Sequence, residues 1–210
     1  MPEHDITLVC FDLGGVLVRI CRSWEEGCAA AGVDIRDRPR TDEQEAIRRR
    51  AVDDLQTGDI EPHDFWRTIA ECYNHAYSPE EIERVHRAWT LDEYTDVVTL
   101  ISQIHDAGHA TACLSNTNAI HWEELVNLGS LRALQHLHAS HLMGMIKPDG
   151  SIFERFERER ERQPGNILFF EDTEANAIAA RERGWHAHVV DPHQETVPQM
   201  LRVLRQYNLL

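Results

Sequence analysis

Lysine is almost absent from this chain. Lysine and arginine together number 21 among 210 residues, and only Lys147 is a lysine. An ammonium is a compact point charge, whereas a guanidinium is a planar fork, so the two do not replace each other in a tight site. The single lysine therefore marks Lys147 as a candidate functional residue, with an accident of composition as the alternative.

Excess positive charge and long hydrophobic runs are also missing. The formal net charge is −15 at pH 7. This balance argues against wholesale binding to nucleic acid or to anionic membranes, because both reward a basic surface. It leaves room for a local basic pocket that binds a small anion. No apolar run approaches the roughly 20 residues of a membrane span. We therefore expect neither a nucleic-acid partner nor a membrane.

The cysteines lack the spacing of a disulfide framework or a zinc site. There are five, an odd count, and none forms a C-x-x-C pair. The opening stretch MPEHDITLVCFD has neither the basic region nor the long apolar run of a secretory signal. We therefore expect a cytoplasmic protein with free thiols. The length suits one core domain with a modest insertion, and we expect a monomer or a homodimer.

Strands and helices are predicted to alternate over most of the chain. Apolar stretches that end at turn residues predict buried strands at 6–12, 109–114, 134–139, 166–170 and 186–190. Helical periodicity fills the segments between them. Alternation at this spacing predicts a parallel sheet with helices on both faces. The expected fold class is α/β, a Rossmann-like three-layer core.

The segment from 22 to 92 differs from the rest because it has helical periodicity, many charges and no convincing strand. The runs Thr41–Gln44 and Ser78–Glu81 are capping boxes, which begin helices. We predict a small helical cap at 21–92, inserted after the first strand of a core formed by 1–20 and 93–210. Its tryptophans are expected to form the interior of the cap, with a platform for a sugar as the alternative: Trp24, Trp66 and Trp89.

Chemically useful side chains follow the predicted strands. Ligands of parallel sheets bind at the carboxyl ends of the strands. These ends carry Asp12 with Gly14 and Gly15, then Ser115 and Asn116, then Lys147, and finally Glu171 and Asp172. Carboxylates from two strands suit a hard cation such as Mg²⁺. A carboxylate can attack phosphorus when nearby positive charge neutralises the developing charge. Glycines let backbone amides approach a phosphate closely.

Four sequence stretches carry a family resemblance: FDLGGVLV, LSNTN, the lysine in MIKPDGSIF, and FFEDTEANAIAA. In this order they resemble the four motifs of the haloacid dehalogenase-like (HAD) hydrolases, over about residues 5–191. The helical insertion resembles the small cap of the cap-class-one members. FDLGGV with LSNTN is most similar to the branch that holds bacterial α-D-glucose-1-phosphate phosphatases and the N-terminal phosphatase domain of soluble epoxide hydrolases.

The resemblance implies a role for each matching residue. Asp12 is expected to be the nucleophile that forms an aspartyl-phosphate, and Lys147 a catalytic residue that also tethers it. Mg²⁺ is expected to bind Asp12, Asp172 and the backbone carbonyl of Gly14. Glu171 and Asn176 are expected to orient the metal ligands. The phosphoryl group is expected to contact Gly14, Gly15, Ser115, Asn116 and Lys147.

The resemblance is incomplete at Gly14, where most phosphatases of the family carry a second Asp that acts as general acid and base. Such a group contributes about 10²–10⁴-fold to the rate. We expect a Mg²⁺-dependent phosphatase of a small phosphomonoester, with a sugar phosphate as the leading substrate. His63, Asp64 or Glu171 are the candidates to replace the acid. A metal-independent 2-haloacid dehalogenase and a non-catalytic phosphate-binding or scaffold protein remain alternatives.

For two further groups of polar side chains, we expect structural roles rather than metal or substrate binding. His136, His138 and His141 have a spacing that a zinc pair could use, but we expect a polar strand edge or hydrogen-bonded core residues. Arg19 and Arg22 follow the first motif and are expected to serve the hinge or the surface. A contact with the distal part of an anionic substrate is the alternative for these arginines.

Overall fold

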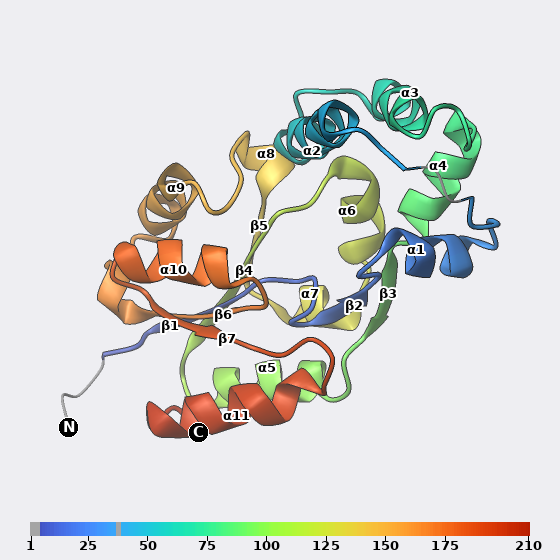
Figure 1. The fold of residues 1–210 in the computed structure, drawn as a ribbon. Helices are drawn as coiled ribbons and strands as arrows, with labels where there is room; N and C mark the ends of the chain where they lie inside the picture. The colour runs from blue at the N-terminus through green and yellow to red at the C-terminus, as the bar shows by residue number, and fades with distance from the viewer. Residues whose placement is uncertain (1–4, 37–38) are drawn as a thin grey trace.

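The computed structural model describes residues 5–36 and 39–210, and a five-stranded parallel sheet forms its centre (Figure 1). The strand order is β5-β4-β1-β6-β7, and all neighbouring strands are parallel. The strands are β1 (Leu8–Phe11), β4 (Ala110–Ser115), β5 (His136–Ala139), β6 (Ile167–Glu171) and β7 (His186–Val189). The predicted α/β Rossmann-like core is confirmed, and its five predicted strands are present.

Helices cover both faces of the sheet because alternate strand residues point to opposite sides. Val9 and Phe11 pack into one apolar cluster with residues of α5 (Val97–Asp106) and α11 (Thr196–Gln206). Leu8 and Cys10 pack into a second cluster with residues of α9 (Gly150–Arg160) and α10 (Glu174–Glu182). Shorter helices complete the core: α6 (Ala119–Leu125), α7 (Gly129–Ala133), α8 (Ser140–Met143) and a 3₁₀ turn at Pro164–Asn166.

The described part of the insertion holds helices α1 (Trp24–Ala31), α2 (Asp42–Thr57), α3 (Pro62–Cys72) and α4 (Pro79–Arg87). The side chains of Ser23, Thr41 and Ser78 accept the hydrogen bonds that begin helices, and both predicted capping boxes are present. Trp66 is buried in the cap's apolar cluster, and Trp24 and Trp89 pack against it half-buried. The division into a core and a cap at 21–92 stays a prediction.

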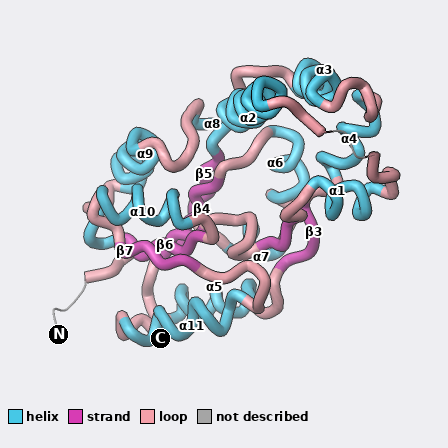
Figure 2. The backbone as a smooth tube through the Cα atoms, viewed as in Figure 1, coloured by secondary structure: helices cyan, strands magenta, loops and turns pink. Residues whose placement is uncertain are grey.

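A two-stranded antiparallel ribbon lies where the chain enters and leaves the insertion. It pairs β2 (Val18–Ile20) with β3 (Thr90–Glu93), and Figure 2 draws the ribbon apart from the main sheet. The expectation of no strand within 22–92 was therefore wrong at Thr90–Asp92. These strands are three and four residues long and the middle of β3 is exposed, so no apolar alternation marks them.

Neither the helices nor the cysteines contradict the expectations from composition. Among residues 5–36 and 39–210, no helix is long and apolar enough to cross a membrane. All five cysteines carry buried free thiols. Residues 1–4, which open the stretch expected to carry no secretory signal, lie outside the described residues.

The three histidines with zinc-like spacing have separate surroundings. Arg160 donates to Nδ1 of His136 at 2.6 Å. The ring of His138 packs edge-on against Phe156, and the ring of His141 against Trp122. Within the part of the chain that the structure describes, Asp12, Glu171 and Asp172 form the one cluster of potential metal ligands. The structural role expected for the histidines therefore fits their contacts.

Burial of His138 makes the free energy of unfolding depend on pH. Desolvation lowers the pKa of His138 from 6.5 to about 4. Between these values the unfolded chain binds the proton first, so acid favours unfolding. We expect His138 to cost about 1 kcal/mol of stability between pH 6.5 and pH 5.5. Urea unfolding of the wild type and of His138→Gln at both pH values measures this. Equal pH slopes in the two proteins would contradict the assignment.

Candidate active site

The register of the sheet brings the ends of three strands to the same level. Phe11 pairs with Cys113 on one side and with Phe170 on the other. The next residue of each strand is therefore also level: Asp12, Leu114 and Glu171. Since the three strands are parallel, their carboxyl ends open on one edge of the sheet.

Lys147 lies among these three residues with its side chain fully buried. Its ammonium donates to the backbone oxygen of Leu114 at 2.9 Å and to Oε2 of Glu171 at 2.7 Å, and lies 3.1 Å from Oδ1 of Asp12. Burial alone lowers the pKa of Lys147, but the carboxylates of Asp12 and Glu171 outweigh it and raise the pKa. Lys147 therefore stays charged, and two carboxylates share its one ammonium.

Glu171 is buried at the end of β6 and supports the loop that follows. Its Oε1 accepts the backbone N–H groups of Asp172 at 3.1 Å and Thr173 at 3.0 Å. Burial raises the pKa of Glu171, and the ammonium of Lys147 lowers it. Glu171 therefore ties Lys147 to the loop that carries Asp172.

Three carboxylates form a cluster with the chemistry of a cation site. Asp12, Glu171 and Asp172 each offer an oxygen atom, and these atoms lie within 4.8 Å of one another. All three donor atoms are hard carboxylate oxygens. Asp12 follows β1, Glu171 ends β6, and Asp172 comes directly after Glu171. This donor set fits Mg²⁺, which prefers carboxylate oxygens and water. Asn176 is buried near the start of α10, the helix that follows this loop.

Arg22 connects the start of the insertion to this cluster. Its Nη1 donates to Oδ2 of Asp172 at 2.6 Å. Gly15 makes the approach possible, because a Cβ at Gly15 would lie 2.0 Å from Arg22 Nη2 and 2.5 Å from Asp172 Oδ2. The φ of Gly15 is 77°, a conformation that favours glycine. Arg22 therefore contacts the core at the acidic cluster, and its hinge role stays a prediction.

Two of the predicted phosphate contacts have other partners in the structure. The N–H of Gly15 donates to the backbone oxygen of Val18 at 2.7 Å. The side-chain amide of Asn116 exchanges two hydrogen bonds of 2.8 Å with the backbone of Lys147. These hydrogen bonds occupy the Gly15 N–H and one N–H of the Asn116 amide, and the phosphate contacts expected of both residues stay predictions. Asn116 also fixes the position of Lys147, while Ser115 is buried at the end of β4.

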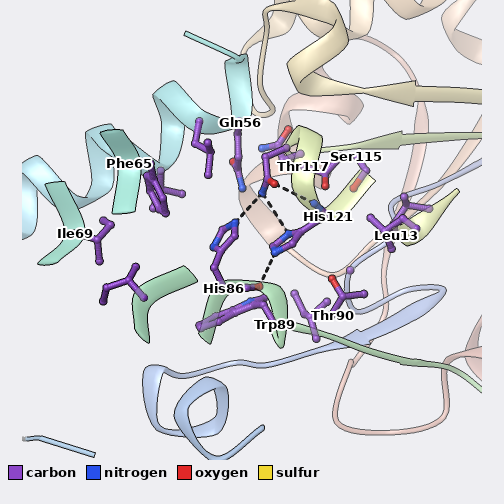
Figure 3. A pocket seen from close by; sticks show the side chains of 18 of the residues that line it. Leu13, Gln56, Phe65, Ile69, His86, Trp89, Thr90, Ser115, Thr117 and His121 are labelled. Atoms are coloured by element: carbon purple, nitrogen blue, oxygen red, sulfur yellow. Dashed lines mark hydrogen bonds between the residues drawn. The ribbon is translucent and has the colours of Figure 1, made fainter. Parts of the chain in front are cut away.

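A cavity of about 260 Å³ lies between the strand ends and the cap helices. Leu13, Gly14 and Ser115 line its core end, and Phe65 and Ile69 line it from α3. Figure 3 shows the rings of His86 and His121 between these two groups. Sequence reasoning missed both histidines, because each is a lone histidine on a helix and the two are far apart in the chain.

The candidates for a replacement acid from the cap surface do not lie in this cavity. The side chains of His63 and Asp64 are 71% and 50% exposed and lie 3.3 Å from each other. Neither lines the cavity. They are separated from the cluster because α3 turns its apolar face inward, with Phe65, Trp66 and Ile69 buried. His63 and Asp64 therefore lie on the exposed side of α3, and their role as the acid stays a prediction.

Comparisons with solved structures bear on the fold. A predicted HAD-like family hydrolase from Porphyromonas gingivalis has a TM-score of 0.76 and 23% identity, over 96% of this chain and 98% of that one. A HAD family enzyme from Bacteroides thetaiotaomicron, crystallised with magnesium and inorganic phosphate, has a TM-score of 0.70 and 20% identity, over 92% and 98%. At these identities the likeness shows a shared fold.

A third solved structure represents different chemistry on the same fold. The L-2-haloacid dehalogenase from Xanthobacter autotrophicus, with chloropropionic acid covalently bound, has a TM-score of 0.61 and 16% identity, over 98% of this chain and 84% of that one. A family model described as haloacid dehalogenase-like hydrolase matches residues 6–184. This match spans both the strand ends that carry the carboxylate cluster and the whole helical insertion, and so this chain belongs to the haloacid dehalogenase-like hydrolases.

Proposed function

We propose that this protein is a Mg²⁺-dependent phosphatase of small phosphomonoesters, with Asp12 as the nucleophile. The observation that carries the proposal is the contact of Asp12 with a buried, charged lysine at 3.1 Å, inside a cluster of three carboxylates. A lysine there neutralises charge on a phosphoryl group as well as on the nucleophile.

The reaction takes place in two displacements at phosphorus. A carboxylate oxygen of Asp12 attacks phosphorus while the bond from phosphorus to the alcohol oxygen breaks. Water then attacks phosphorus, the bond to Asp12 breaks, and inorganic phosphate leaves with the carboxylate restored. Lys147 and the hydroxyl of Ser115 hold phosphoryl oxygens. The backbone N–H groups of Leu13 and Gly14, which have no backbone acceptor among the described residues, are donors for the same oxygens.

Asp12, Asp172 and the carbonyl of Gly14 are the residues that would hold Mg²⁺. The bound ion would neutralise charge on the phosphate and help to orient it. Glu171 and Asn176 would support these ligands from within the fold, Glu171 through its hydrogen bonds to the loop of Asp172.

The leaving group must depart without the usual acid. Gly14 has no side chain, and Ile20 packs over it with Cδ1 only 3.0 Å from where a Cβ would lie. The alcohol oxygen of the substrate therefore leaves as an anion and takes its proton from solvent. This mechanism favours esters whose alcohols are acidic, such as phenols, because their anions need less protonation.

Restoring the acid is expected to broaden the range of leaving groups. Gly14→Asp alone would press on Cδ1 of Ile20, so Ile20→Val is added to remove that atom. The double variant is expected to hydrolyse an alkyl phosphate up to about 10²-fold faster, with little change for an aryl phosphate. Phosphate release from both esters, with Ile20→Val as the control, measures the effect. An unchanged alkyl rate would contradict the role given to Gly14.

Several finer expectations belong to the same proposal. The four helices that the structure describes between β2 and β3 support a cap-class-one organisation. The branch with glucose-1-phosphate phosphatases, the sugar-phosphate substrate and a cytoplasmic location rest on sequence features alone. The lining of the cavity favours an alcohol other than a sugar.

The test of the proposed function measures phosphate release and halide release side by side. The enzyme is assayed with phenyl phosphate, and separately with a 2-haloacid, each with Mg²⁺ and with a chelator. Phosphate release that needs Mg²⁺ is the expected result. Halide release without metal would instead support a dehalogenase. Binding of Mg²⁺ and phosphate without turnover of any phosphomonoester would support a binding or scaffold role.

A further inference from the structure

The walls of the cavity are mainly apolar. They combine the core residues Leu13 and Leu125 with side chains from α2, α3 and α4, among them Leu55, Phe65, Ile69 and Ile82. These four cap residues are at most 5% exposed and belong to the apolar cluster of the cap. The cavity is therefore a mainly apolar recess beside the strand ends, and its far wall is the interior of the cap.

A hydrogen-bond network fixes the protonation of the two histidines in the cavity. Oδ1 of Asn118 accepts the backbone N–H groups of Ile120 and His121, so Nδ2 of Asn118 is the donor. This Nδ2 lies 3.1 Å from Nε2 of His86 and 3.2 Å from Nδ1 of His121, and both ring nitrogens accept. Nε2 of His121 donates to the backbone oxygen of His86 at 2.8 Å.

Both imidazoles are therefore neutral. Their rings stack with centroids 4.2 Å apart, which also disfavours two positive charges. Burial lowers the pKa of each, and for His86 well below its usual value. The guanidinium of Arg48 also lines the cavity, but Nε and Nη2 donate to Glu45 at 3.0 and 2.6 Å. The cavity thus offers no unpaired charge to a second anionic group among the side chains that the structure describes.

The size and polarity of the cavity limit what it can hold. An apolar cavity of about 150 Å³ takes a benzene molecule. The 260 Å³ found here has room for one ring or two fused rings. Those hydroxyls of a hexose that face Leu55, Phe65 and Ile82 would lose their hydrogen bonds to water without replacement. A ring with few polar groups would lose nothing comparable.

We propose that the cavity binds the alcohol part of the substrate, and that this part is an uncharged, largely apolar ring system, as in an aryl phosphate. The proposal rests on the proposed function, because it places the phosphoryl group at Asp12 and the ring in the cap. It agrees with the loss of the acid at Gly14, since aryl alcohols leave readily as anions. The neutral pair of His86 and His121 gives the recess a polar patch for a single uncharged substituent.

Three esters separate this proposal from the proposed function. Acetyl phosphate has a small leaving group that needs neither the cavity nor an acid, so it tests Asp12 alone. 2-Naphthyl phosphate fills the cavity, and glucose 1-phosphate presents a sugar to it. We expect kcat/KM for the naphthyl ester to exceed that for the sugar ester by about tenfold or more.

A narrowing variant locates the preference in the cavity. Val52 lines the cavity from α2, and Val52→Phe takes up part of its space. We expect this variant to lower kcat/KM for 2-naphthyl phosphate by about tenfold and to leave acetyl phosphate unchanged. Ile47→Phe is the matched control, because Ile47 lies on the same helix, is 46% exposed and does not line the cavity.

Each outcome decides between the two proposals. An equal or reversed preference between the naphthyl and sugar esters, with acetyl phosphate hydrolysed normally, would overturn the apolar-ring proposal. A failure to hydrolyse acetyl phosphate would overturn the proposed function instead. In that event calorimetric titration with 2-naphthol decides separately: binding that weakens in Val52→Phe but not in Ile47→Phe supports the apolar recess, and absent binding contradicts it.

Discussion

Lys147→Met is expected to lower the free energy of unfolding by about 3–5 kcal/mol, the cost of breaking a buried ion pair by removing one partner. The ammonium of Lys147 is the positive group between Asp12 and Glu171, at 3.1 and 2.7 Å. Its loss leaves two carboxylates in a buried site and frees the backbone oxygen of Leu114. Urea unfolding of the purified variant and of the wild type measures the difference.

Two companion variants identify the cause of this loss. Arg202 is exposed on α11, so Arg202→Met removes the same charge from the surface and is expected to change stability by less than about 0.5 kcal/mol. Lys147→Met with Glu171→Met removes both members of a buried pair and is expected to regain part of the loss. If Lys147→Met lowered the free energy of unfolding no more than Arg202→Met does, the stabilising role given to the buried ion pair of Lys147 would be wrong.

Asp12→Asn is expected to reduce phosphate release by roughly 10⁴- to 10⁶-fold, as when a member of a covalent catalytic group is removed. A neutral amide is a poor nucleophile towards phosphorus and cannot form the acyl phosphate. The fold should persist, since Lys147 keeps its 2.7 Å contact with Glu171 and its bond to Leu114. Steady-state release of phosphate from phenyl phosphate, with circular dichroism as the check on folding, measures both expectations.

The control for this variant is a carboxylate of the same type on the surface. Asp106 is exposed at the end of α5, and Asp106→Asn is expected to leave turnover unchanged. Turnover of Asp12→Asn near that of Asp106→Asn would mean that another group attacks the substrate. The covalent mechanism would then be wrong, although the family membership would stand.

The features that could be read from the sequence are those with a local or periodic signal. The apolar run before Asp12 and the glycines after it predict a buried strand and its turn. Capping residues such as Thr41 and Ser78 begin helices through contacts within four residues of the chain. Because parallel strands open their carboxyl ends on one edge, the meeting of Asp12 and Asp172 also follows from strand positions alone, whereas Lys147 reaches Asp12 from the loop after α8.

The remaining features depend on contacts between distant segments. β3 pairs with β2 across the whole insertion, and nothing in its four residues marks that pairing. Asn116 and Gly15 have the residue types of a phosphate site, but their hydrogen bonds go to Lys147 and Val18. These partners are chosen by loop geometry, which residue type does not reveal.

The histidine pair shows the same limit for the cavity. His86 comes from the end of α4 and His121 from α6, and Asn118 joins them only once both helices are in place. Of the three, Asn118 alone has a local signal, because asparagine is a favoured residue at the start of a helix and caps α6 here. The polarity of the cavity could therefore be read only from the structure. Its mainly apolar lining does not favour the sugar phosphate that the family resemblance suggested.

The most direct test of the account is chemical trapping of the intermediate on Asp12. The enzyme is mixed with phenyl phosphate and Mg²⁺, quenched in acid and treated with borohydride, which reduces an aspartyl-phosphate to homoserine, and the peptides are then weighed by mass spectrometry. If Asp12 is the nucleophile, we expect this mass change in the peptide that contains Asp12, and no change when substrate is omitted. Continued phosphate release with Asp12 unmodified would contradict it.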